Sequence, residues 1–249
     1  TTGIAGQESM QGKEMSYNNY LDVHAAVSLC RELPGYATVI VKHNNPCGVA
    51  VGSNQLESYI KAREVDPVSA YGSIVAMSTE VGADVAKEIC STFVEVLVAP
   101  SFTEEALEIM QSKPNMRVLI LPPAEEADEL RTIDGGILVQ RTPEYTEDWK
   151  VVSKRQPTED EMEAFKLAWK VVKYAKSNAI IYSNKTETVG IGVGQMNRVN
   201  SAQIAIEKAA EFGRTMEGTV VASDAFLPFP DTLEVAAAAG ATALIQPGG

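Results

Sequence analysis

Histidine and cysteine are scarce in this sequence. Its 249 residues include only two histidines, His24 and His43, and three widely spaced cysteines, Cys30, Cys47 and Cys90. Three thiols at such spacings do not form a disulfide framework and are typical of a reducing compartment such as the cytoplasm. With only two histidines in the chain, the composition also argues against a histidine-rich metal site.

The sequence also lacks long apolar runs and an excess of positive charge. No stretch approaches the roughly 18 apolar residues of a membrane-spanning helix, and no basic segment with an apolar core, as in a secretory signal, opens the chain. The formal charge is −12, from 33 acidic residues against 21 lysines and arginines. Such a balance argues against a nucleic-acid partner, although local cations and helix N-termini can still bind one phosphate. We therefore expect a cytoplasmic protein with neither a membrane span nor a nucleic-acid partner.

Helical and strand-like hydrophobic spacings alternate along the chain, which predicts an α/β architecture. Thr158 and Glu161 predict a capping box, and Met162, Phe165 and Trp169 follow it on one helical face. The acidic stretch 122–129 is a predicted surface loop, and a second half is expected to begin at 149. Helices are expected at 20–33, 56–65, 104–112, 158–175, 200–210 and 232–239, and strands at 36–43, 72–77, 94–99, 116–121, 179–183, 188–193, 219–223 and 242–246.

Polar segments that follow strands are the candidate sites, because open α/β sheets bind ligands beyond the carboxyl ends of their strands. Lys42 and His43 lie where the strand 36–43 ends, before a turn signal at 44–46. A histidine titrates near neutrality and can accept a proton from an amine that attacks a carbonyl. A neighbouring lysine can stabilise negative charge on the carbonyl oxygen. The alternative is a lysine that reaches water at a strand end, beside a histidine that caps a turn.

A second candidate segment, Lys176-Ser177-Asn178, separates a predicted helix from a predicted strand. The asparagine side chain donates and accepts hydrogen bonds at once, which suits a carboxamide or a formyl oxygen. Serine and asparagine are equally common as turn residues that follow a helix, so both interpretations remain open.

The glycine-containing segment 190–200 (GIGVGQMNRVN) is a third candidate. It fails the dinucleotide pattern G-x-G-x-x-G, because Asn197 stands at the last glycine position, and no Gly-Lys-Ser/Thr follows to make a P-loop. A glycine turn with Arg198 just before a helix N-terminus can still hold an anion. Asn200 with Gln203 predicts the N-cap of that helix. The alternative is that the glycines serve tight strand packing.

The fourth candidate is segment 223–231 (SDAFLPFPD), which follows another strand. Two aromatic rings and two prolines form a stiff apolar wall on which a flat heterocycle can stack, and Asp231 can accept hydrogen bonds from ring N–H groups. The alternative is a proline-rich turn in which Asp231 is the N-cap of the next helix. The two interpretations are compatible.

Seven stretches together resemble one known family and follow its order from about residue 10 to the C-terminus. They are QGKEMSYNNYLD, VKHNNPCGVA, DPVSAYGSIVAMS, RTIDGGILVQ, WKVVKYAKSNAII, VGIGVGQMNRVNSA and ASDAFLPFPD. The chain resembles the transformylase domain of the bifunctional purine-biosynthesis family, aminoimidazole carboxamide ribonucleotide (AICAR) transformylase/inosine monophosphate (IMP) cyclohydrolase.

This resemblance implies an activity, a fold and an assembly. The activity is formyl transfer from 10-formyltetrahydrofolate to the 5-amino group of AICAR, in de novo IMP biosynthesis, with no metal required for the chemistry. The fold is a three-layer, mixed-sheet α/β architecture of two cytidine-deaminase-like subdomains, 1–148 and 149–249. The assembly is a homodimer with sites at its interface, and a cyclohydrolase domain is expected N-terminal to this region in the parent protein.

The resemblance also implies site residues by position. Lys42 and His43 resemble the family's pair in which histidine accepts or relays the proton and lysine stabilises the transition state. Asn178 resembles the asparagine that orients the carboxamide and the formyl group. Nucleotide-contacting positions are Asn19, Arg198, Phe226 and Ser73, the last standing where some relatives carry an aspartate, and folate-site positions are Val199, Pro228, Phe229 and Asp231.

Two alternatives to an active transformylase follow from departures in the sequence. The family's Arg-Tyr-Gly segment before Thr1 and its continuation after Gly249 are not part of the sequence, and the chain opens without Met, so an inactive or weakly binding fragment that keeps the fold and dimer interface is one alternative. A zinc nucleoside deaminase is the minor alternative. That chemistry needs H-x-E and P-C-x-x-C, whereas His43 lacks the glutamate and Cys47 lacks the second cysteine.

Overall fold

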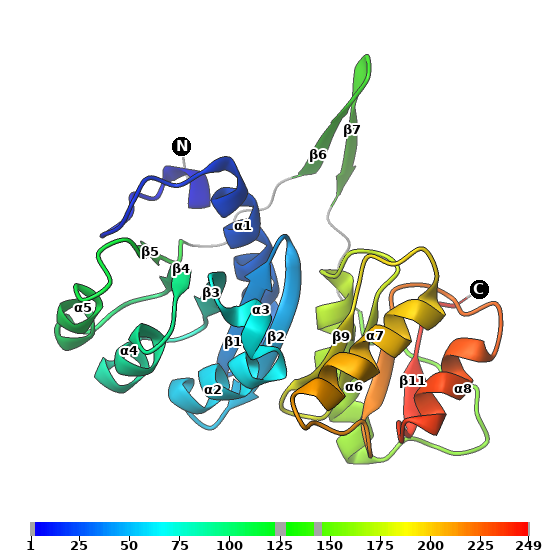
Figure 1. Ribbon diagram of the computed structural model, residues 1–249. Helices are drawn as coiled ribbons and strands as arrows, with labels where there is room; N and C mark the ends of the chain where they lie inside the picture. The colour runs from blue at the N-terminus through cyan, green and yellow to red at the C-terminus, as the bar shows by residue number, and fades with distance from the viewer. Residues whose placement is uncertain (1–2, 123–127, 142–145, 249) are drawn as a thin grey trace.

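The computed structural model describes residues 3–122, 128–141 and 146–248, and in these ranges two mixed β-sheets and a separate hairpin are present (Figure 1). The five-stranded sheet has the order β2-β1-β3-β4-β5, and the four-stranded sheet has the order β11-β10-β8-β9. The hairpin is formed by β6 and β7. The strands are β1 Tyr36–Lys42, β2 Asn45–Gly52, β3 Ser73–Met77, β4 Val94–Ala99, β5 Arg117–Ile120, β6 Asp128–Ile133, β7 Gly136–Arg141, β8 Ile180–Ser183, β9 Thr188–Gly192, β10 Val220–Ser223 and β11 Ala243–Ile245.

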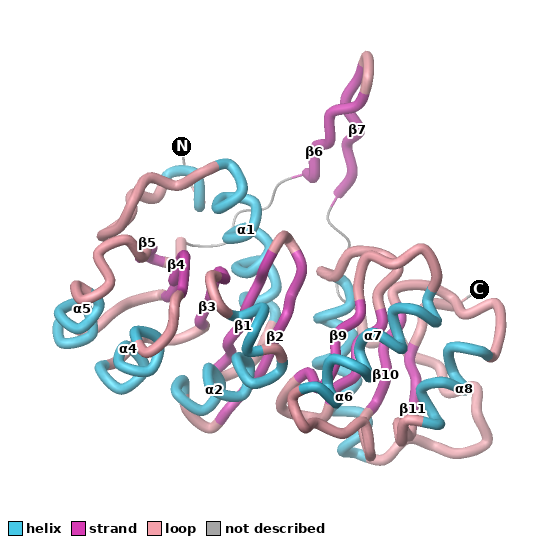
Figure 2. The backbone as a smooth tube through the Cα atoms, in the orientation of Figure 1, coloured by secondary structure: helices cyan, strands magenta, loops and turns pink. Residues whose placement is uncertain are grey.

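Helices flank the strands of both sheets (Figure 2). They are η1 Ile4–Gly6, α1 Tyr17–Glu32, α2 Gln55–Val65, α3 Pro67–Ala70, α4 Ala83–Cys90, α5 Glu104–Met110, α6 Glu159–Lys173, α7 Arg198–Glu211 and α8 Asp231–Ala238. Every helix and strand expected from the sequence is present, with ends displaced by at most three residues. The sequence analysis did not anticipate η1, β2, α3, α4, β6 or β7. Residues 123–127 of the expected loop 122–129 lie outside the described residues, and Asp128 and Glu129 belong to β6.

The two main sheets repeat one topology. In each, a helix is followed by an antiparallel hairpin, β1–β2 or β8–β9. The next strand then pairs antiparallel with the first strand of that hairpin: β3 with β1, and β10 with β8. The strand after it pairs parallel with its predecessor: β4 with β3, and β11 with β10. The repeat is one of topology, since the sequence shows no repeat at the level of residue identity. The boundary between residues 148 and 149, and the deaminase-like character of each half, stay predictions.

Alternating side chains of the strands divide the core into layers. Val39 and Val41 of β1 face a core that is shared with α1 and α6. Ile181 of β8 belongs to the same core, which therefore lies against both sheets. Ile40 of β1 faces the opposite side, where α2, α4 and α5 pack on the first sheet, while Tyr182 of β8 faces a separate core under α7 and α8. The three-layer, mixed-sheet α/β fold expected from the sequence is therefore confirmed.

The edge strands β2 and β9 bring the two sheets together. The amide of Val51 donates to the carbonyl of Thr186 at 2.7 Å. The hydroxyl of Thr188 accepts from the amide of Val49 at 3.1 Å and lies 3.2 Å from the Val49 carbonyl. Backbone groups that an edge strand would leave unpaired are thus satisfied across this seam between β2 and β9.

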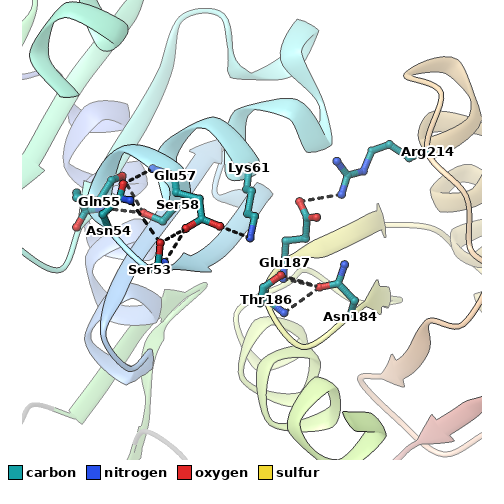
Figure 3. A network of polar contacts seen from close by, with 10 residues as sticks. All are labelled: Ser53, Asn54, Gln55, Glu57, Ser58, Lys61, Asn184, Thr186, Glu187 and Arg214. Atoms are coloured by element: carbon teal, nitrogen blue, oxygen red, sulfur yellow. Dashed lines mark hydrogen bonds and ion pairs between the residues drawn. The ribbon is translucent and has the colours of Figure 1, made fainter. Parts of the chain in front are cut away.

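Polar side chains order the turns on both sides of the seam (Figure 3). On the first side the Glu57 carboxylate accepts the amide of Ser53 at 2.8 Å, in the turn between β2 and α2, and pairs with Lys61 at 2.7 Å. On the second side the side-chain oxygen of Asn184 accepts the amide of Glu187 at 3.0 Å, and Arg214 forms an ion pair with the Glu187 carboxylate at 2.9 Å. These contacts fix the hairpin turn whose strand, β9, meets β2.

Helix starts follow capping chemistry more closely than hydrophobic spacing. The capping box of Thr158 and Glu161 is confirmed at the start of α6. The N-cap of α7 is Asn197, whose side chain accepts the amide of Asn200 at 2.8 Å, so the prediction of Asn200 as the cap was wrong. Asp231 is likewise the first residue of α8 rather than its N-cap.

Candidate functional site

The turn that follows β1 has left-handed backbone geometry. His43 and Asn44 have φ angles of 53° and 62°, and Lys42 pairs with Asn45 across a two-residue hairpin loop. Two consecutive residues with positive φ are typical of the hairpin turn that matches strand twist. The amide of Asn44 donates to the Asp22 carboxylate at 2.7 Å, which ties the turn to α1. The turn therefore holds an exposed His43 at a fixed position.

Lys42 is half-buried, and its Nζ donates to the carbonyl of Tyr71 at 2.5 Å. Tyr71 is the C-cap of α3, and β3 begins two residues later at Ser73. Ser73 is buried, and its hydroxyl donates to the carbonyl of Ala70 at 2.7 Å. Ser73 thus lies close in the chain to the contact made by Lys42, but its hydroxyl proton is used in a local hydrogen bond. A ligand would meet Ser73 as a hydrogen-bond acceptor.

The loop before β8 lies against the turn of His43. The side-chain oxygen of Asn45 accepts the amide of Lys176 at 3.0 Å, so a direct hydrogen bond joins the two loops. Asn178 follows a cis peptide bond after Ser177. The Asn178 side chain donates to the Gln195 carbonyl at 2.6 Å. The structure therefore brings the segment of Asn178 close to that of Lys42 and His43.

Arg198 is the first residue of α7, a helix that contacts the Asn178 loop through the Ser201 hydroxyl, which donates to the Asn178 carbonyl at 2.8 Å. Its guanidinium is 3.7 Å from the Asp224 carboxylate, which also accepts the amide of Ala179 at 3.0 Å. Its buried Nε has no hydrogen-bond partner among the described residues. The Arg198 side chain remains 22% exposed, so its guanidinium and the adjacent helix N-terminus are suited to an anion. Val199, half-buried, is the next residue of the same turn.

The loop after β10 carries the predicted stacking residues. Phe226 and Phe229 expose 47% and 68% of their surface, and Pro228 is exposed between them. The loop is anchored through the amide of Leu227, which donates to the Gln246 side chain at 2.6 Å. Asp231 accepts the amide of Thr232 at 2.7 Å. Two exposed rings on an anchored loop can take a flat heterocycle.

Asn19 is buried in the first turn of α1. Its side-chain oxygen accepts the amide of Ser16 at 3.0 Å and lies 2.9 Å from the Ser16 hydroxyl, which completes a capping box. The oxygen is committed to the helix, so any ligand contact would come from the amide nitrogen. Asn19 precedes Asp22 by one turn and therefore lies on the side of α1 that holds the His43 turn.

A cavity of about 280 Å³ opens at the seam between the halves. Its walls come from the β1–β2 turn, the α2–α3 junction, β9 and α7, and they include Lys42, His43, Cys47, Asp66 and Lys208. Burial and the nearby Asp66 carboxylate raise the pKa of Cys47 to about 12. The thiol is therefore protonated at neutral pH and is no nucleophile.

Asp66 and Lys208 connect the two walls of this cavity. Their side chains form an ion pair at 2.8 Å, and Asp66 also accepts the amide of Ser69 at 2.9 Å as N-cap of α3. Burial acts to raise the pKa of Asp66, but the hydrogen bonds from Lys208 and Ser69 outweigh it and hold that pKa below its usual value. The sequence analysis missed both residues. Asp66-Pro67 carries an N-cap signature that could have been found, whereas nothing in the sequence marks Lys208.

The described residues contain no cluster of three or more His, Cys, Asp or Glu side chains that could hold a metal ion. In the same ranges, no helix combines the length and the apolar character that crossing a membrane requires.

Comparison with known proteins identifies the relatives of the chain. Residues 1–208 match the family model of the AICARFT/IMPCHase bienzyme. The chain is 48% identical over 249 residues to the bifunctional purine biosynthesis protein PurH of Aquifex aeolicus (strain VF5), covering 99% of this chain and 49% of that protein. It is 50% identical over 252 residues to the PurH of Halalkalibacterium halodurans, with the same two coverages. The chain therefore spans about half the length of these relatives, and it belongs to the AICARFT/IMPCHase bienzyme family.

Proposed function

We propose that this chain transfers the formyl group of 10-formyltetrahydrofolate to the 5-amino group of AICAR, giving formyl-AICAR in de novo IMP biosynthesis. The observation that carries the proposal is the hydrogen bond between Asn45 and Lys176. It holds a Lys-His turn next to the loop of Asn178 in a member of a family whose relatives are named purine biosynthesis proteins.

His43 acts as the proton acceptor in this mechanism. As the AICAR amine attacks the formyl carbon, a C–N bond forms and His43 takes the proton that the nitrogen loses. Lys42 stabilises the oxyanion that develops on the formyl oxygen, since an ammonium keeps two further N–H groups beside the one bound to Tyr71. The bond from the formyl carbon to N10 of the folate then breaks, and N10 leaves as an amine with a proton returned from His43.

The remaining predicted residues bind and orient the two substrates. Asn178 orients the carboxamide and the formyl group, and Asn19, Ser73, Arg198 and Phe226 contact the nucleotide. Arg198, whose side chain is 22% exposed, offers its guanidinium to an anionic group of the nucleotide. The folate stacks beside Val199, Pro228, Phe229 and Asp231, of which the last three are exposed.

The proposal extends to the setting of the enzyme. We place it in the cytoplasm, without a metal requirement, as a homodimer whose sites lie at the interface. A cyclohydrolase domain N-terminal to this region would account for the second activity that the word bifunctional gives the relatives.

The test is a substitution of each histidine. Purified chain is mixed with AICAR and 10-formyltetrahydrofolate, and the release of tetrahydrofolate is followed. We expect His43→Ala to lower the rate by about 10²–10⁴-fold, because loss of a general base has that effect. His24→Ala is the matched control, since His24 is also exposed and lies on α1. Absence of transfer by the unmodified chain, or equal rates for the two variants, contradicts the proposal.

A further inference from the structure

The ammonium group of Lys42 has a backbone partner whose direction is set by one turn. The Lys42 Nζ donates to the carbonyl of Tyr71 at 2.5 Å. Tyr71 has φ and ψ angles of −67° and 118°, and the next residue, Gly72, has a φ of 72°. These angles match a type II turn, in which the third of the four residues has a positive φ and is usually glycine. The turn runs from Ala70, the last residue of α3, to Ser73, the first residue of β3.

The central peptide of this turn, between Tyr71 and Gly72, is bound on both sides. Its carbonyl accepts from Lys42, and its N–H, which belongs to Gly72, donates to the carbonyl of Phe93 at 2.7 Å. The rings of Tyr71 and Phe93 pack together, with centroids 5.4 Å apart. A type I turn differs from a type II turn by rotation of this central peptide through about half a turn. In a type I turn the carbonyl would therefore point away from Lys42, and the N–H would point away from Phe93.

We infer that Gly72 is a positioning residue for Lys42, because it selects the turn whose central carbonyl holds the ammonium group. This role rests on the proposed function, in which the two remaining N–H groups of Lys42 stabilise the formyl oxygen. A hydrogen-bond donor contributes most to catalysis when its direction is fixed before the reaction begins. The bond to Tyr71 restricts a flexible lysine side chain in this way, and a glycine, which tolerates positive φ, keeps the carbonyl in place.

Replacement of Gly72 by alanine tests this role in catalysis. Alanine disfavours a positive φ, so the central peptide should rotate towards the type I conformation and release Lys42. We expect Gly72→Ala to lower kcat about 10–100-fold, less than the loss of an oxyanion donor, since the ammonium group is displaced but still present. The KM for AICAR should stay within about twofold, because binding common to the ground state and the transition state is retained. In a Lys42→Met background, Gly72→Ala should lower kcat no further.

Two further variants separate the choice of turn from crowding and from backbone strain. Asparagine is accepted at the third position of a type II turn although it is larger than alanine, so Gly72→Asn should keep at least about threefold more activity than Gly72→Ala. Crowding would reverse this order, because a Cβ at Gly72 would lie 3.2 Å from the Phe93 ring. Gly218→Ala is the matched control for strain and should be as active as the unmodified chain. Gly218 has a φ of 73°, and a Cβ there would have no described atom within 4 Å apart from its chain neighbours.

Chemical labelling reports on Lys42 without any substrate. The chain is treated briefly with acetic anhydride, and acetylation of Lys42 is measured by mass spectrometry relative to the exposed Lys154. We expect Gly72→Ala to raise the labelling rate of Lys42 about threefold or more, since loss of one hydrogen bond frees the amine. Gly218→Ala should leave that rate unchanged. An unmodified chain that transfers no formyl group would contradict the proposed function, and the labelling would still test the role of Gly72.

Three results would overturn the inference. The first is equal labelling of Lys42 in Gly72→Ala and Gly218→Ala. The second is a Gly72→Asn variant that is less active than Gly72→Ala. The third is a Gly72→Ala variant that circular dichroism shows to be unfolded, since Gly72 would then be needed for the fold rather than for the placement of Lys42. We expect the fold to be retained, because the turn lies at the surface, where Tyr71 is 63% exposed.

Discussion

Replacement of Gly192 by alanine tests how the fold holds the candidate site. A Cβ at this position would lie 1.8 Å from the carbonyl oxygen of Ser201 and 2.6 Å from its carbonyl carbon. Both are backbone atoms of α7, so no side-chain rotation relieves the contact. To restore ordinary van der Waals separation, α7 must retreat from β9 by about 1.5 Å.

The cost of this retreat can be worked from the contacts that it breaks. Overpacking of a buried position costs about 1–3 kcal/mol, and a backbone obstacle belongs at the upper end of that range. The buried Ser201 hydroxyl also donates to the carbonyl of Asn178 at 2.8 Å, and losing that bond adds about 1 kcal/mol. We therefore expect Gly192→Ala to lower the free energy of unfolding by about 3–4 kcal/mol. Since Arg198 begins the same helix, the proposed function predicts that the affinity for AICAR falls as well.

Urea-induced unfolding followed by circular dichroism measures the stability change, and calorimetry measures nucleotide binding. Gly136→Ala is the control, because the nearest atom to its added Cβ would be a side-chain carbon of Ile133 at 3.8 Å. This control should remain within about 0.5 kcal/mol of the unmodified chain. If Gly192→Ala unfolds at the same urea concentration as Gly136→Ala, the close approach of β9 and α7 does not contribute to the stability of this fold as expected.

Two other predictions concern ion pairs. Hydrogen bonds from Arg155 hold the pKa of Glu161 at about 2, so the stability that this carboxylate contributes is present above its unfolded pKa near 4.5 and is lost as the pH falls towards 2. Glu161→Gln should cost about 1 kcal/mol at pH 7 and progressively less below pH 4.5, as measured by urea unfolding across that range; a constant difference would contradict this origin. Lys208→Met should cost about 1 kcal/mol and raise the pKa of Asp66, and in an Asp66→Asn background the same change should cost almost nothing.

Hydrophobic patterning predicted the buried parts of the fold well. Val94–Ala99 is a strand with the expected ends, because an apolar run in an α/β chain has few alternatives to a central strand. The face of Met162, Phe165 and Trp169 packs on the shared core as the helical spacing indicated. Where one face of an element is buried, the spacing of its apolar residues is enough to predict its secondary structure.

Strand β2 was missed because its sequence, NPCGVAVG, begins with residues that favour turns. Pro46 is tolerated there since it pairs with Val41 at a break in the register, where the ladder is already irregular. Gly48 is required for another reason, because a Cβ would lie 1.9 Å from the Ala62 carbonyl oxygen in α2. Neither role can be recognised in the sequence until the neighbouring strand and helix are in place.

The β6–β7 hairpin was missed for the opposite reason. Asp134-Gly135 is a strong hairpin turn signal, but the flanking strands show no clean alternation because the described residues bury neither face of the hairpin. Residue patterning reports burial, so a hairpin that is exposed on both faces leaves no alternation to recognise.

The candidate site belongs to neither half of the chain. Lys42 and His43 come from the first repeat and Asn178 and Arg198 from the second, and their segments meet because β2 and β9 join the sheets. The two hairpins of the repeat differ in the length of their turns: two residues join β1 and β2, whereas a longer turn joins β8 and β9. The short turn holds His43 in left-handed geometry. The longer turn contains Thr186, whose carbonyl accepts the amide of Val51 across the seam. A repeated topology can thus supply, from the same position in each half, one turn that carries the candidate site residue His43 and one turn that joins the two sheets.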